Sequence, residues 1–189
     1  MSFLDDAFLI DWSKLTADRV EPELRTALAR ARAAIDAFKA QRPDELGYER
    51  TLLGLESATR ELDRAWGLVS HLDSVLNSPE LRKAYNALLP DVTAFYTSIP
   101  LDPAVWSVLK AYAAMPGAKA LAGIRRRFLE ETLAGFVESG ADLPEASKRR
   151  LAEVNARLAE ITQKYSENVL DSTNGWELYV TDEARLAGL

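Results

Sequence analysis

The helical spacing of apolar residues is the feature that most constrains this chain. Between Val20 and Phe38 the apolar positions lie three or four residues apart, so they share one face of a helix. Further stripes with the same spacing run through residues 48–76, 81–99, 105–112, 121–137 and 151–165. The pattern predicts an all-α chain of about six mostly antiparallel helices, followed by one short C-terminal strand.

Cap and turn residues mark the ends of these helices. Ser78–Pro79 and Asp102–Pro103 each combine a favoured N-cap residue with proline at the first helical position. Gly140 fits the position just after a helix end. Pro144 opens the longest helix, which we expect to end near Asn174–Gly175.

Three interior residues predict irregular helices. Gly54 and Gly67 lower the helix propensity of the second stripe, so we expect a kink or break within residues 48–76. Pro90 lies inside the third stripe, where it removes a hydrogen bond, and it predicts a kink near residues 87–90.

The longest helix carries both an apolar stripe and a charged face. We expect the stripe to pack on the bundle, as in other amphipathic helices. Acidic residues precede basic residues by four positions at 145–149, 153–157 and 160–164, an order typical of a solvent face. The stripe consists of Leu151, Val154, Leu158, Ile161 and Tyr165.

The two ends of the chain depart from the helical pattern. Residues 7–10 are apolar and predict an arm packed on the domain. Residues 176–180 alternate like a strand, and 181–183 look like the start of another helix. A lone strand needs a partner, either the arm near 8–10 or additional sequence, so we interpret this end as a cut. We divide the chain into an arm (1–15), a helical domain (16–175), and a strand with the start of a truncated next segment (176–189).

The absence of cysteine and the presence of one histidine exclude many kinds of site. Without cysteine there is no disulfide, thiolate zinc site, iron–sulfur cluster or cysteine nucleophile. One histidine cannot supply a motif that needs two, such as paired Glu-x-x-His iron ligands. We expect His71 to be structural and hydrogen-bonded within the bundle, and Asp5–Asp6 and Glu130–Glu131 to be solvated. The residues therefore nominate no catalytic or metal-binding group and identify no substrate-binding residue.

The net charge of −6 argues against nucleic acid as a partner. Basic clusters at 125–127 and 148–150 would form one patch only if their helices folded back at matching height. No apolar run approaches the roughly 20 residues that span a bilayer. No leader sequence is visible, so we expect a cytoplasmic protein without membrane contact.

Residues 168–174 are unusually polar for the end of an apolar stripe. Asn168 falls where the stripe expects an apolar residue, and Ser172, Thr173 and Asn174 follow it. One interpretation is a helix terminus whose side chains satisfy its last carbonyls. The other is a polar strip that lines a cleft and hydrogen-bonds a peptide backbone.

Four stretches occur in an order and spacing that match a known family. They are WGLVSHLDSV at 66–75, NSPELRKAY at 77–85, YSENVLDSTN at 165–174 and VTDEARLAG at 180–188. From about Leu15 to Leu189, the ordered set resembles the N-terminal helical region of oligopeptidase A, within the thimet oligopeptidase-like zinc metallopeptidases.

The resemblance implies a cytoplasmic enzyme that hydrolyses short peptides in a deep channel between two mainly helical halves. In that family zinc sits on a His-Glu-x-x-His helix with a further glutamate ligand, and the motif's glutamate activates the zinc-bound water. This chain lacks the motif, so the resemblance assigns zinc to a C-terminal catalytic domain, which would be the partner of this part. The chain itself is then expected to wall the channel, restrict substrate size, lack activity alone, and expose an apolar surface that the other half covers.

Two alternatives remain open. The chain could be a stand-alone helical module that binds a peptide or protein in a groove without catalysis. It could also be a homodimeric structural bundle whose exposed apolar face is covered by a second copy.

Overall fold

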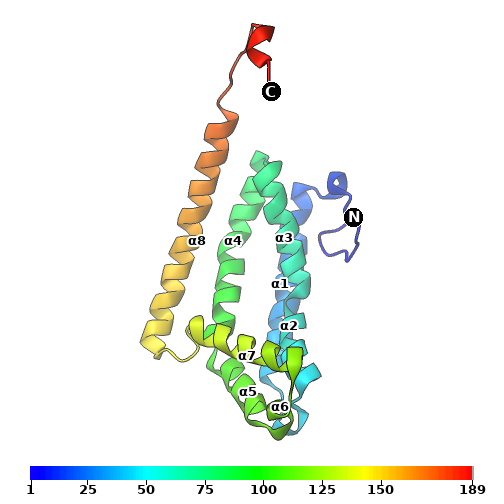
Figure 1. Cartoon of the computed structure of the whole chain (residues 1–189), viewed down its shortest axis with the longest axis vertical. Helices are drawn as coiled ribbons and strands as arrows, with labels where there is room; N and C mark the ends of the chain where they lie inside the picture. The colour runs from blue at the N-terminus through cyan, green and yellow to red at the C-terminus, as the bar shows by residue number, and fades with distance from the viewer. Residues whose placement is uncertain (189) are drawn as a thin grey trace.

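A computed structural model describes residues 1–188, and Leu189, the last residue of the expected C-terminal segment, lies outside the described residues. The described part of the chain is all-α, as predicted, with more helices than the expected six or so. Long helices run along the long axis of the molecule, and shorter ones close one end (Figure 1). The helices are α1 (Ala17–Lys39), α2 (Gly54–Ala58), α3 (Arg60–Val75), α4 (Pro79–Leu101), α5 (Pro103–Ala114), α6 (Pro116–Lys119), α7 (Gly123–Glu138) and α8 (Glu145–Asn174).

The core lies between α1, α3 and α4. Helix α1 contacts both of the others, and the stripe predicted from Val20 to Phe38 is buried against them. Leu62 and Val69 of α3 and Leu88 of α4 are fully buried in the same cluster. Each large side chain buried in this way contributes about 1.5–3 kcal/mol of transfer free energy, so the three helices form a stable centre.

The second predicted stripe is divided among three elements, which explains the higher helix count. A π-helical stretch, η3 (Tyr48–Leu53), is followed by α2 and α3. The predicted break is confirmed and falls at Thr59, between α2 and α3, whereas Gly67 lies inside an uninterrupted α3. Leu76 was expected in the buried stripe, but it is exposed because it follows the end of α3.

The predicted helix boundaries are confirmed where cap residues set them. Ser78 Oγ accepts a hydrogen bond from Leu81 N at 3.2 Å, and Asp102 Oδ1 accepts one from Ala104 N at 2.7 Å. Gly140 follows α7 with φ +99°, a backbone conformation that side chains rarely adopt. Helix α4 continues through Pro90 without a break.

The N-terminal arm is anchored mainly by its first residues, and only Ile10 of the apolar stretch at 7–10 packs against the core. Phe3 is fully buried in the core, and its backbone N donates to Glu23 Oε2 at 2.6 Å. Arg64 Nε donates to the carbonyl oxygen of Asp5 at 2.9 Å. Phe8, expected to pack on the domain, is 98% exposed, and Leu9 is exposed as well. The prediction is therefore confirmed for Ile10, which is partly buried against the core, and wrong for Phe8 and Leu9.

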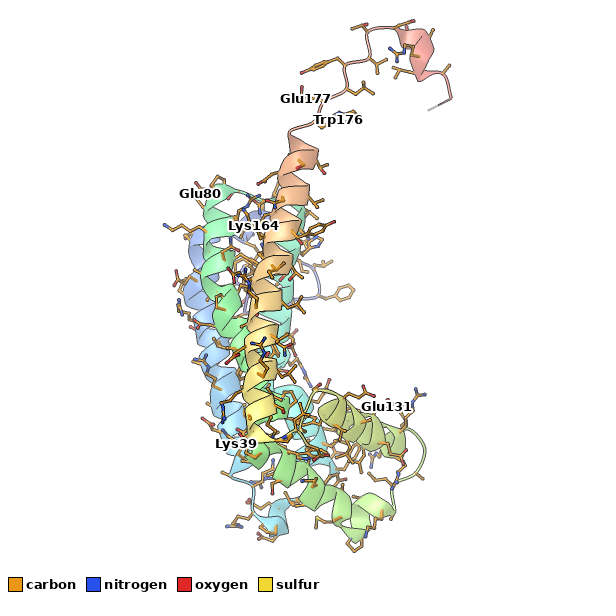
Figure 2. All side chains as sticks on the ribbon, turned by 90° about the vertical axis from the view of Figure 1, so that its left-hand side faces the viewer. Lys39, Glu80, Glu131, Lys164, Trp176 and Glu177 are labelled. Carbon is orange, nitrogen blue, oxygen red and sulfur yellow. The ribbon has the colours of Figure 1, made fainter. Side chains whose placement is uncertain are left out.

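The predicted C-terminal strand is not formed in the described part of the chain. Residues 175–182 have no regular secondary structure, and the segment leaves the end of α8 and projects away from the bundle (Figures 1 and 2). A strand requires hydrogen-bonding partners, and the projecting segment lies beyond the reach of the arm. The predicted helix start corresponds to a short 3₁₀ helix, η4 (Glu183–Leu186), where Asp182 Oδ1 accepts from Ala184 N at 3.0 Å.

We predict that Phe3→Ala lowers the free energy of unfolding by about 3–5 kcal/mol, because it removes a fully buried aromatic side chain and leaves a cavity. The matched variant Phe8→Ala, in the same arm, should change stability by less than about 0.5 kcal/mol. Urea denaturation followed by circular dichroism measures both values. Equal effects would show that the arm is not anchored as described.

Candidate functional site

Helix α8 lies along α4 and turns a small, polar side toward it. Its two buried residues, Lys148 and Glu167, are both charged. Ala152 and Ala159 are partly buried on the same side, and their small side chains allow the two helices to lie close together. Helix α8 is therefore joined to the bundle through polar contacts more than through a hydrophobic stripe.

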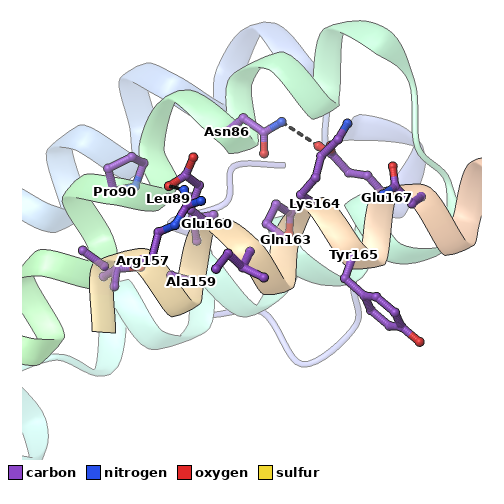
Figure 3. A pocket seen from close by; sticks show the side chains of 14 residues that line it. Asn86, Leu89, Pro90, Arg157, Ala159, Glu160, Gln163, Lys164, Tyr165 and Glu167 are labelled. Carbon is purple, nitrogen blue, oxygen red and sulfur yellow. Dashed lines mark hydrogen bonds and ion pairs between the residues drawn. The ribbon is translucent and has the colours of Figure 1, made fainter. Parts of the chain in front are cut away.

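The large apolar residues of α8 lie on its outer side. The expectation that this stripe packs on the bundle is wrong for most of its length, since Tyr165 is 70% exposed and points away from α4 (Figure 3). The reason is that the N-terminal part of α4 carries the guanidinium group of Arg82 and the amide group of Asn86. Only polar residues of α8 can form hydrogen bonds with these groups. The apolar surface that the family resemblance led us to expect is thus present. Its exposed members are Val154, Leu158, Ile161, Tyr165 and Val169.

A polar cluster joins α3, α4 and α8 near the C-terminal end of α8. Arg82 forms a two-point contact with Asp171, at 2.6 and 2.9 Å between nitrogen and oxygen. Asn86 Nδ2 donates to Glu167 Oε1 at 2.7 Å, a contact drawn in Figure 3. These contacts fix the position of α8 along α4, because each hydrogen bond pairs a particular donor on α4 with a particular acceptor on α8 in a defined geometry.

The third helix enters the cluster through Asp73. This carboxylate is buried, accepts from Asn77 Nδ2 at 2.6 Å, and lies 3.3 Å from Gln163 Nε2 on α8. We call the seven residues the α8 polar cluster. It consists of Asp73, Asn77, Arg82, Asn86, Gln163, Glu167 and Asp171.

The cluster shifts its carboxylates in opposite directions. Burial raises the pKa of Asp73, and the hydrogen bond from Gln163 and the charge of Arg82 offset only part of that rise. The hydrogen bond from Arg82 lowers the pKa of the exposed Asp171. The same contact with Asp171 raises the pKa of Arg82, which stays charged.

Two hollows lie beside this cluster, between α4 and α8. The larger, about 790 Å³, we call the α4–α8 groove (Figure 3). The smaller, about 480 Å³, lies next to Arg82 and Asp171. Apolar groups of Leu89 and Pro90 line the groove beside the amides of Asn86 and Gln163, a combination that can hold an extended peptide.

The polar strip at 168–174 contributes to both hollows. Asn168 lines the groove, and Asp171 and Asn174 line the smaller hollow. Thr173 instead donates to the carbonyl oxygen of Val169 at 2.9 Å. The strip therefore lines a cleft, as the second interpretation predicted, and Thr173 bonds a carbonyl inside the helix rather than one of its last four.

The other groups considered from sequence do not build a reactive site. His71 is exposed on α3, with its ring centre 5.0 Å from that of Trp12, rather than inside the bundle as expected. Among residues 1–188, no cluster of three or more histidine, cysteine, aspartate or glutamate side chains could hold a metal ion. No helix in this range is long and apolar enough to cross a membrane.

The two basic clusters do not form one patch. Residues 125–127 lie at the start of α7, where Arg126 pairs with Glu130 at 2.6 Å. Lys148 is buried at the start of α8 and donates to the carbonyl oxygen of Leu101 at 3.2 Å. The α7 helix separates the clusters, since one lies at its beginning and the other follows its end (Figure 1).

The polar cluster was not predicted from sequence. Asp73 immediately follows stripe residue Leu72, and Asn77 and Arg82 lie around a helix boundary, where polar residues are ordinary. The one available signal was Asn168, a polar residue within an apolar stripe, which marks the level at which α8 meets polar groups of α4.

Comparison with known proteins gives a consistent result. A family model described as "Neurolysin/Thimet oligopeptidase, N-terminal domain" matches residues 24–148. Oligopeptidase A of Haemophilus influenzae is 33% identical over 181 residues, which cover 94% of this chain and 26% of the relative. The "probable cytosolic oligopeptidase A" of Arabidopsis thaliana is 26% identical over 178 residues, covering 94% and 25%.

A more distant relative is also a peptidase by name. Dipeptidyl carboxypeptidase of Escherichia coli is 25% identical over 160 residues, covering 85% of this chain and 23% of the relative. The chain therefore spans about a quarter of the length of the curated relatives that it matches.

We predict opposite pH effects for the two shifted carboxylates. The folded protein keeps the proton of Asp73 to higher pH than the unfolded chain does. The contribution of protonated Asp73 to the free energy of unfolding is therefore lost as pH rises through the raised pKa. The free energy of unfolding of the wild type minus that of Asp73→Asn should fall from about pH 3 upward. The same difference for Asp171→Asn should rise with pH, because its folded-state pKa is lowered. Urea titrations across this range measure both, and slopes of the same sign would contradict the assignment.

Proposed function

The chain belongs to the neurolysin/thimet oligopeptidase family as its N-terminal domain, and from that premise we propose that it is the non-catalytic part of a zinc-dependent oligopeptidase. In this proposal it walls the channel through which short peptides reach the catalytic centre. The α4–α8 groove is the observation that carries the proposal, because it is a long, open hollow with both apolar and amide groups.

The shape of the chain suits a wall. Helix α8 has 30 residues and is about 45 Å long at 1.5 Å per residue. It lies beside α4, and α4 is packed on α1 behind it. The α8 polar cluster fixes the position of α8 in this wall. A channel bounded by such a rigid wall would admit an extended peptide and exclude a folded protein. Steric exclusion would thus restrict the size of the substrate.

The groove favours peptide backbone as its ligand. Asn86, Gln163 and Asn168 line it with amide groups that can both donate to and accept from a backbone. Arg157 and Lys164 at its border are positively charged and would attract the carboxylate end of a short peptide. We propose short, unfolded peptides as the substrate class for the complete enzyme.

Zinc does not fit the groups that this chain offers. The sequence contains no His-Glu-x-x-His motif, and the described residues hold no set of ligands for a metal ion. We therefore assign zinc to the C-terminal catalytic part and assign no chemical step to this chain. We also propose a cytoplasmic location, supported by a plant relative named as cytosolic.

A stand-alone peptide-binding module is the second candidate. It is favoured by the buried cluster that α1, α3 and α4 build from residues of this chain. In that case the groove would bind peptides with no catalytic partner.

We predict that the purified chain does not cleave short fluorogenic peptides, with or without added zinc. A chimera in which this chain replaces the matching N-terminal quarter of Escherichia coli oligopeptidase A should cleave them, and a chelator should abolish the cleavage. The chimera should leave a folded protein substrate intact. Chelator-sensitive cleavage by the chain alone, or a folded chimera that cleaves nothing, would contradict the proposal.

A further inference from the structure

The outer side of α8 has the repeat of a coiled-coil seam. Over two heptads its apolar residues are spaced alternately by three and four positions, which is the spacing of a coiled-coil seam. The seam residues are Leu151, Val154, Leu158, Ile161 and Tyr165. From Val154 to Tyr165 these side chains are more than two-fifths exposed. The C-terminal part of the seam adjoins the α4–α8 groove, since Ile161 and Tyr165 also line that groove, whereas Val154 and Leu158 do not.

A row of basic residues borders the seam on one side. Arg150, Arg157 and Lys164 lie seven residues apart, each next to the apolar stripe, and all three are largely exposed. The opposite border carries the uncharged residues Asn155 and Thr162 at the same spacing. In coiled coils the residues at these two borders select the partner and its orientation.

The basic residues are available to a partner despite pairs within α8. Arg150 lies 3.0 Å from Glu153 and Arg157 lies 2.5 Å from Glu160, so the pairs are three residues apart instead of four as expected from sequence. Such exposed pairs contribute little to stability, and exchanging them for contacts with a partner costs correspondingly little. The glutamates also lie farther from the seam than the basic residues do, because they sit toward the α4 side.

A second copy of the chain is a poor occupant of this seam. In an antiparallel pair the basic border of one copy would face the basic border of the other, which is repulsive. In a parallel pair it would face Asn155 and Thr162, which offer no opposite charge. The charge pattern fits a different helix, one with acidic residues beside its apolar stripe.

We infer that the outer seam of α8 binds an amphipathic helix with an acidic border, and that this helix belongs to the remaining part of the peptidase polypeptide. The relatives are about four times as long as this chain, which leaves ample sequence to supply it. The seam spans 15 residues, so a helix of about four turns covers it. The assignment of the source rests on the proposed function, whereas the chemistry of the partner rests on α8 alone.

The test uses two synthetic 28-residue peptides with leucine at both seam positions of four heptads. One carries glutamate at the border positions and the other lysine, so each repels itself and neither pairs with its own kind. Calorimetric titration of the full chain should give at least about tenfold tighter binding of the glutamate peptide. Equal binding, or none, would overturn the inference.

Variants locate the binding on α8. Val154→Ala with Leu158→Ala, two seam residues outside the groove, should weaken binding of the glutamate peptide at least about tenfold, while Ile124→Ala, an exposed residue of α7, should not. The triple variant Arg150→Glu, Arg157→Glu and Lys164→Glu should reverse the preference toward the lysine peptide. The control triple Arg32→Glu, Arg60→Glu and Arg127→Glu changes the net charge equally but lies elsewhere, and should keep the original preference.

Two further measurements test the source of the helix. The wild-type chain should sediment as a monomer; a dimer that the double alanine variant dissociates would assign the seam to a second copy. In the chimera with Escherichia coli oligopeptidase A, the α8 triple variant should lower the melting temperature more than it does in the isolated chain. An equal change in both would overturn the assignment to the remaining polypeptide.

The inference and the proposed function fail separately. An inactive but folded chimera, with the peptide preference intact, would refute the proposed function and leave the seam. An active chimera with no peptide preference would refute the seam alone.

Discussion

The polar contacts between α8 and α4 are the interaction on which the rest of the surface depends. Arg82, Asn86 and Asp73 can be satisfied only by polar groups, so α8 turns Gln163, Glu167 and Asp171 toward them. With the polar side of α8 facing α4, its large apolar side chains lie on the opposite side and face solvent. The groove, the small hollow and the exposed seam all follow from the rotation of one helix about its axis.

Buried charged and amide groups suit positioning better than net stabilisation. Removing them from water is costly, and the gain from pairing offsets that cost only when the geometry is good. The result is a single alignment of α8 along α4, since a slip of one turn would separate Glu167 from Asn86 and Asp171 from Arg82. An apolar interface of the same size would tolerate such slips more easily, and a groove built on it would vary in width.

Local signals were sufficient to predict much of this fold. The buried stripe of α1, the caps at Ser78 and Asp102, and the positive φ of Gly140 depend on residues within a few positions of each other. The outward rotation of α8 could not be predicted in this way, because it depends on polar groups of α4 that lie about 80 residues earlier. The expected strand failed for a related reason, since alternation at residues 176–180 indicates a tendency that only a neighbouring strand can realise.

The projecting C-terminal segment has a spectroscopic consequence. The four tryptophans differ in their surroundings. Trp106 is buried, Trp66 is stacked on Tyr85, Trp12 is 40% exposed beside His71, and Trp176, beyond the end of α8, is 69% exposed. Water reaches the Trp176 indole directly, so its emission lies to the red and an aqueous quencher reaches it easily. Any molecule that settles against the upper end of α8 would shield this ring first. The chain thus carries its own optical reporter just beyond the C-terminal end of α8.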